Sequence, residues 1–111
     1  MSILAQITEG WKTTMGPFTL QGNGAALNLT GMTVRLKMRD GFNTVFPDTG
    51  TLTIDPTPTT GRVTYLPSGT EFVADGAMSR VLSVHFEVTD GAGHVLYVPN
   101  GAPDTIIVWP K

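Results

Sequence analysis

Apolar and polar residues alternate along two stretches of this chain, a pattern typical of β-strands with one buried face. The first stretch covers residues 80–90 and has apolar residues at every second position: Leu82, Val84, Phe86 and Val88. The second covers residues 32–39 and does the same with Met32, Val34, Leu36 and Met38. We predict that both are strands of an all-β fold and that the first is central to it.

Turn-forming residues separate these strands from shorter apolar runs. Gly-Ala-Gly follows Asp90 and leads into the run His94–Val98, a spacing that predicts a hairpin. Thr51–Asp55 and Arg62–Leu66 flank a Pro-Thr-Pro-Thr-Thr-Gly turn and predict a second hairpin. Asp104–Trp109 is the last predicted strand.

The beginning of the chain is less regular. Gly16-Pro17 interrupts the stretch from Trp11 to Gln21, and proline cannot donate to a ladder, so a strand there is short or at an edge. We interpret residues 1–10 as an amino-terminal arm and residues 11–111 as a single β-sandwich domain. About seven short strands at spacings near ten residues predict an antiparallel immunoglobulin-like β-sandwich.

Composition narrows the classes of function. The 111 residues include no cysteine, which excludes a disulfide framework and a thiolate zinc site and fits assembly in a reducing cytoplasm. Charged residues make up 14%, the net charge is -2 and no basic tail is present, so we expect no nucleic-acid partner. We also expect no signal peptide and no membrane span. A sparsely charged, weakly acidic chain favours contacts with other proteins, without a cofactor.

Few residues invite a chemical role. Ser83, His85 and Glu87 share the polar face of the central strand, but same-face neighbours are about 7 Å apart, which does not suit a nucleophilic triad. We interpret this face as solvated and His94 as part of a surface loop. The aspartates fall at strand ends and turns, where carboxylates bond to backbone amides. The alternative is that two of these aspartates, from two loops, bridge a calcium ion. The aspartates at strand ends and turns are Asp40, Asp48, Asp55, Asp75, Asp90 and Asp104.

Candidate interface residues come from three places. Arg35, Lys37 and Arg39 form a basic stripe on one strand face. The stripe is either a solvated face, countered by Glu87 across the sheet, or a surface that meets an acidic patch on a neighbouring subunit. The arm would add a strand to a neighbour, and Trp11 is a possible contact residue, whereas we expect Trp109 in the core. The candidate interface residues are Ile3, Ile7, Trp11, Arg35, Lys37 and Arg39.

Three pieces of the chain, in order, are similar to a known family. The run Leu29-Thr-Gly-Met-Thr-Val resembles the Asp-Leu-Thr-Gly-Ala-Thr-Val strand of phage baseplate upper proteins, in their amino-terminal immunoglobulin-like domain. Gly61-Arg-Val-Thr-Tyr resembles the family's Gly-x-Val-x-Tyr strand. Phe86-Glu-Val-Thr-Asp-Gly, followed by Val98-Pro-Asn-Gly, resembles its ending. The family's acid before Leu-Thr-Gly is Asn28 here, and we expect no extension of the kind that longer members carry after this domain.

The resemblance implies a structural component of a bacteriophage virion, without catalytic activity, in the tail or baseplate. It would fold in the host cytoplasm and join the particle in several copies, or as a homo-oligomer, through contacts with other virion proteins. The alternatives are a capsid decoration or head–tail accessory protein and a small carbohydrate-binding β-sandwich module. A carbohydrate module would display aromatic side chains on one exposed face.

Overall fold

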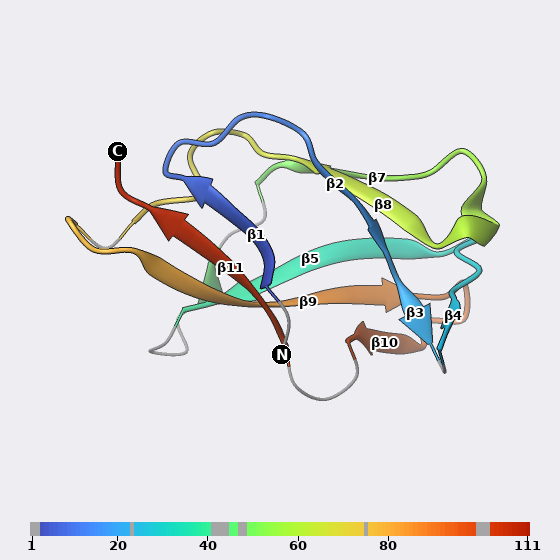
Figure 1. Cartoon of the computed structure of the whole chain (residues 1–111). Helices are drawn as coiled ribbons and strands as arrows, with labels where there is room; N and C mark the ends of the chain where they lie inside the picture. Colours follow the sequence, from blue (N-terminus) through green and yellow to red (C-terminus); the bar gives the residue numbers. More distant parts are fainter. Residues whose placement is uncertain (1–2, 23, 41–44, 47–48, 75, 100–102) are drawn as a thin grey trace.

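The computed structural model describes residues 3–22, 24–40, 45–46, 49–74, 76–99 and 103–111. This part of the chain consists of β-strands joined by turns and has no α-helix (Figure 1). The fold is therefore all-β, as predicted. The larger sheet contains β1 (Ile3–Thr8), β5 (Thr33–Arg39), β6 (Val45–Phe46), β9 (Arg80–Thr89), β10 (Val95–Val98) and β11 (Asp104–Trp109). The smaller sheet contains β2 (Met15–Thr19), β7 (Thr51–Ile54) and β8 (Arg62–Leu66).

Strand β9 is the centre of the larger sheet, whose order is β1-β11-β9-β5-β6. The predicted strands at 80–90 and 32–39 are confirmed as β9 and β5, which pair antiparallel from Thr33 opposite Thr89 to Arg39 opposite Ser83. In this register the apolar positions of both strands fall on the same face. One face of the sheet is therefore buried and the other carries the intervening side chains.

The other edge of β9 pairs with two strands placed end to end. β10 lies opposite residues 86–89 and β11 lies opposite residues 80–84. The predicted hairpin between β9 and β10 is confirmed, and Asp90 fixes its turn. The Asp90 carboxylate accepts hydrogen bonds from the backbone amides of Ala92 and His94, both at 2.9 Å.

The first strand corrects the prediction of an arm. Residues 3–8 form β1, which pairs parallel with β11 of the same chain, so the sheet is mixed rather than antiparallel. Ile7 lies opposite Val108 and is only 5% exposed, because both side chains enter the core. Ile3 lies beyond a register shift and is 58% exposed. The amide of Glu9 also donates to the carbonyl of Trp109 at 2.8 Å, so residues 3–9 belong to the sheet.

The smaller sheet has the order β2-β8-β7. The predicted hairpin of residues 51–55 and 62–66 is confirmed as β7 and β8, with the 3-10 helix Pro58–Thr60 in its turn. The prediction for residues 11–21 also holds, because β2 is an edge strand whose register shifts between Met15 and Phe18. Two further short strands, β3 (Gln21–Gly22) and β4 (Ala25–Ala26), pair with each other.

The inward faces of the two sheets contribute to one hydrophobic core. Phe18 of β2 and Phe86 of β9 meet across it, with ring centroids 5.8 Å apart. The core residues of the larger sheet include Ile7, Val34, Leu36, Met38, Leu82, Val84, Phe86, Val88, Val98, Ile106 and Val108. Those from β2, β8 and the loops include Met15, Leu20, Leu29, Val63, Tyr65 and Phe72.

A buried glutamate fixes the segment that leaves β8. Glu71 is 2% exposed, and its carboxylate accepts a hydrogen bond from the Tyr65 hydroxyl at 2.7 Å. It also accepts from the amide and hydroxyl of Ser68, at 3.1 and 3.0 Å, and from the amide of Gly69 at 3.1 Å. Tyr65 in turn accepts from the amide of Gly50 at 2.9 Å. The carboxylate thereby links the core to two loops.

Candidate interaction site on the larger sheet

The side chains that alternate with the core residues form the outer face of the larger sheet. β5 contributes Thr33, Arg35, Lys37 and Arg39, β9 contributes Val81, Ser83, His85, Glu87 and Thr89, and the edges contribute Val45, Val95, Tyr97, Thr105, Ile107 and Trp109. We call this set the outer face. Successive side chains of a strand point to opposite faces of the sheet, so the residues that alternate with core residues all lie on the outer face.

The strand register sets charged and aromatic groups side by side on the outer face. Arg35 lies directly opposite Glu87, and Glu87 lies opposite Tyr97 on its other side. The Tyr97 hydroxyl donates to the Glu87 carboxylate at 3.3 Å. The predicted alternative in which Glu87 counters the charge of the basic stripe is therefore consistent with the register. Charge on this face is partly balanced where β5, β9 and β10 meet.

His85 is half-buried rather than fully solvated. Its ring lies at the edge of the Tyr97 ring, with centroids 6.1 Å apart and an interplanar angle of 74°. Lys37 lies opposite it on β5. The Glu87 carboxylate is held by Tyr97, and Ser83, His85 and Glu87 follow one another along a single strand. This arrangement supports packing between side chains rather than a nucleophilic triad.

A groove of about 580 Å³ runs along this part of the outer face. Its walls carry cations from β5, an apolar side chain from β6 and the aromatic and acidic groups of β9 and β10. The lining residues are Lys37, Met38, Arg39, Val45, His85, Glu87 and Tyr97. A surface of this kind can receive a partner's apolar side chain and orient it through charges at the rim.

Apolar side chains extend the outer face beyond the groove. Val45, Val81, Val95, Tyr97 and Trp109 are all exposed, by 47% to 61%. Solvated faces of antiparallel sheets normally carry polar residues, so this mixture of cations and exposed apolar groups needs another explanation. Exposed apolar surface rimmed by polar residues is typical of a protein-contact site.

The prediction of Trp109 in the core was wrong. Ile106 and Val108 face inward on β11, so the period of two turns Trp109 outward. Its indole N–H donates to the side-chain oxygen of Gln6 on β1 at 3.3 Å.

The structure brings together some of the predicted interface residues and separates others. Arg35, Lys37 and Arg39 share the outer face, as predicted. Ile3 is exposed at the start of β1, whereas Ile7 is in the core and unavailable to a partner, which corrects its assignment. Trp11 is partly buried against the core, and its indole N–H has no acceptor among the described residues.

Aspartates take several roles at the turns. Asp55 accepts from the amide of Thr57 at 2.8 Å, and Asp90 accepts from backbone amides as predicted. Asp40 instead forms an ion pair with Arg80 at 3.2 Å. Asp48 and Asp75 lie outside the described residues. In the described part of the chain, no group of three or more His, Asp or Glu residues is placed to hold a metal ion.

None of the described segments forms a helix long and apolar enough to cross a membrane. Comparisons of the chain with models of protein families, with curated proteins and with solved structures gave no match. Functional inference therefore depends on the residues and surfaces of this chain.

Proposed function

We propose that this chain is a structural component of a bacteriophage virion, in the tail or baseplate, and that it acts through protein–protein contacts. The outer face carries this proposal, because it combines a basic stripe, a groove and five exposed apolar side chains on one sheet. Association driven by the apolar groups and oriented by the cations is the function that this geometry supports best.

We further propose that the fold is an immunoglobulin-like sandwich. Immunoglobulin domains place strands B, E and D in one sheet and strands G, F and C in the other. The order β2-β8-β7 matches B-E-D, and β11-β9-β5 matches G-F-C, in the same sequence along the chain. These are six of the seven strands of the immunoglobulin pattern. The seventh, strand A, belongs to the sheet of B, E and D, whereas β1 pairs parallel with β11 in the other sheet.

The family resemblance supports the placement in a virion. Its pieces contribute to β5, β8 and β9, each of which pairs with a strand on both sides, and β5 also carries the basic stripe. The Asn-Gly of its last piece, at positions 100 and 101, lies outside the described residues. A capsid decoration or head–tail accessory protein would use the same kind of contact face, so the site of attachment distinguishes these roles.

A carbohydrate-binding module is the less favoured alternative. Two aromatic side chains, Tyr97 and Trp109, are exposed on the outer face. Tyr97 lies opposite Glu87, and Trp109 lies one residue beyond Val108, the partner of Arg80. About eight strand residues, or roughly 26 Å, therefore separate the two rings along the direction of β9. Such a distance does not provide neighbouring rings for one sugar chain.

The virion assignment is tested by labelling the chain in phage particles. Particles produced from a genome that encodes a tagged copy should bind a gold-labelled antibody at the tail or baseplate in negative-stain images. Gold at the capsid would replace the tail assignment with a decoration role. If the tagged protein is not found in purified particles, the virion proposal is wrong.

The contact face is tested in the same particles with two matched pairs of substitutions. Val81→Thr with Val95→Thr changes two half-exposed residues of the outer face, whereas Leu66→Thr with Val73→Thr changes two similarly exposed residues elsewhere. We expect the first pair to reduce incorporation by about tenfold and the second pair to have little effect. Equal incorporation of both variants would exclude the outer face as the contact surface.

A further inference from the structure

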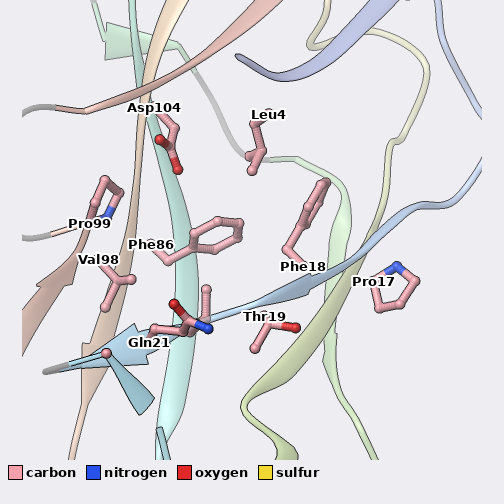
Figure 2. A pocket seen from close by; sticks show the side chains of 11 residues that line it. Leu4, Pro17, Phe18, Thr19, Gln21, Phe86, Val98, Pro99 and Asp104 are labelled. Carbon is pink, nitrogen blue, oxygen red and sulfur yellow. The ribbon is translucent and has the colours of Figure 1, made fainter. Parts of the chain in front are cut away.

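A second cavity lies between the two sheets, at the point where β10 ends and β11 begins. Its volume is about 540 Å³, within the range of about 300 to 1,000 Å³ found for ligand sites. Phe18 and Phe86 form its apolar walls, with Leu4 and Asp104 at one side and Gln21 at the other (Figure 2). We call this cavity the edge cleft.

Asp104 is an unusual residue for this position. It is opposite Val84, which is fully buried, so the register turns the Asp104 side chain toward the space between the sheets. It forms no hydrogen bond or ion pair with the described part of the chain, and Figure 2 shows its carboxylate directed into the cleft. Asp104 is partly buried, and a carboxylate beside apolar walls attracts a cation more strongly than one surrounded by water.

The edge cleft also adjoins an open strand edge. β1 covers only β11, with Ile3 opposite Thr105, and no described strand pairs with the outer edge of β10. Val98 and Pro99, at the end of β10, line the cleft. An extended segment added along β10 would pair with its free backbone groups and direct alternate side chains between the sheets.

We propose that the edge cleft binds an extended segment of a partner protein that carries a lysine or arginine. The segment would pair with β10, and the cationic side chain would lie along the rims of the Phe18 and Phe86 rings and reach Asp104. Aromatic faces attract cations and pack against the methylene stems of these side chains. This site is separate from the outer face, prefers the opposite charge and does not depend on the virion assignment.

Three capped peptides test the chemistry. Acetyl-Thr-Val-Xaa-Val-Thr-amide, with lysine, norleucine or glutamate at Xaa, is titrated into the full chain while backbone amide shifts are followed by NMR. Norleucine retains the apolar stem without the charge. We expect lysine to bind about tenfold more tightly than norleucine, and glutamate more weakly than both. The shifts should be concentrated at residues 18–21 and 95–98.

Two matched substitutions locate the preference. Asp104→Asn removes the charge from the cleft and should abolish the preference for lysine while the norleucine peptide binds as before. Asp55→Asn removes an equal charge from the turn that follows β7, away from the edge cleft, and should leave all three affinities unchanged. Circular dichroism checks that both variants are folded.

Several outcomes would overturn the proposal. Equal affinities for the three peptides, or no binding, would exclude a cation site. Shifts concentrated on the outer face would place binding elsewhere. Butylamine binding as tightly as the lysine peptide would show that the strand edge contributes nothing.

Discussion

At the scale of single residues, Glu71 is the side chain with the clearest energetic role. Its carboxylate accepts four hydrogen bonds from Tyr65, Ser68 and Gly69 while it is nearly inaccessible to water. Glu71→Gln would present an amide group to some of these donors. We expect it to lower the free energy of unfolding by about 2 kcal/mol, measured by urea denaturation at pH 7.

Glu87→Gln is the control for this substitution, since it makes the same chemical change on the outer face. It should alter stability by less than about 0.5 kcal/mol. Equal losses in the two variants would mean that the Glu71 hydrogen bonds do not stabilise the fold.

Acid should remove the contribution of Glu71. Burial on its own would raise the pKa of Glu71, but the hydrogen bonds from Tyr65 and Ser68 outweigh it and hold the pKa below its usual value. The folded state then binds this proton more weakly than the unfolded state. The stabilisation is complete above the unfolded pKa, about 4.3, and is lost as pH falls through the lower folded pKa.

The measurement is a series of urea midpoints from pH 7 down to pH 3. Wild type should lose more stability over this range than Glu71→Gln, which has no carboxylate at this position. Asp90 contributes to the remaining acid sensitivity of both proteins, because hydrogen bonds from His94 and Ala92 also lower its pKa. Parallel curves would contradict the assignment to Glu71.

At the scale of elements, the sharpest prediction concerns the stability that two residues of β1 contribute. Ile3 and Ile7 belong to the same strand but are 58% and 5% exposed. Ile7→Ala should leave a cavity in the core and cost about 3 kcal/mol. Ile3→Ala should cost less than about 0.5 kcal/mol, and thermal or urea unfolding would measure both. Similar small effects would show that residues 3–8 are an arm after all.

The strands that could be predicted are those in which the alternation of apolar and polar residues determines which face of the strand is buried. The alternation in 32–39 and 80–90 gave β5 and β9, because a shift by one residue would expose every apolar side chain. β1 could not be placed this way. Ile3, Ala5 and Ile7 alternate equally well in an arm and in a strand, and its partner β11 is about a hundred residues away in the sequence.

At the scale of the whole molecule, the basic stripe should control partner binding. Arg35→Glu with Lys37→Glu would replace two cations of the outer face with anions and weaken incorporation into particles by about tenfold or more. The remaining binding should become less sensitive to salt, because exposed charge pairs weaken as ionic strength rises. Particle copy number, measured at two salt concentrations, checks both expectations.

Lys12→Glu with Arg62→Glu is the matched control for charge. Both residues are exposed and lie away from the larger sheet's outer face. The control has the same net charge as the test variant. If it reduces incorporation equally, overall charge rather than the stripe determines binding.

The site could be predicted only in part, for a related reason. Arg35, Lys37 and Arg39 sit on a long regular strand, so their shared face was evident. Tyr97 and Trp109 lie on short apolar runs, where the pattern does not tell which residues face the core. The edge cleft depends on β10 and β11 pairing with the same edge of β9, one after the other, which no local pattern indicates.

The parallel pairing of β1 with β11 also determines how the molecule responds to mechanical load. Ile3 lies opposite Thr105 and Thr8 lies opposite Trp109, so the beginning of β1 and the end of β11 are at opposite ends of one ladder. Figure 1 shows both arrows pointing the same way. Tension between the two ends of the chain would therefore pull the strands past each other in shear. The ladder's hydrogen bonds would share that load together, whereas a hairpin pulled from its open end loses them one at a time.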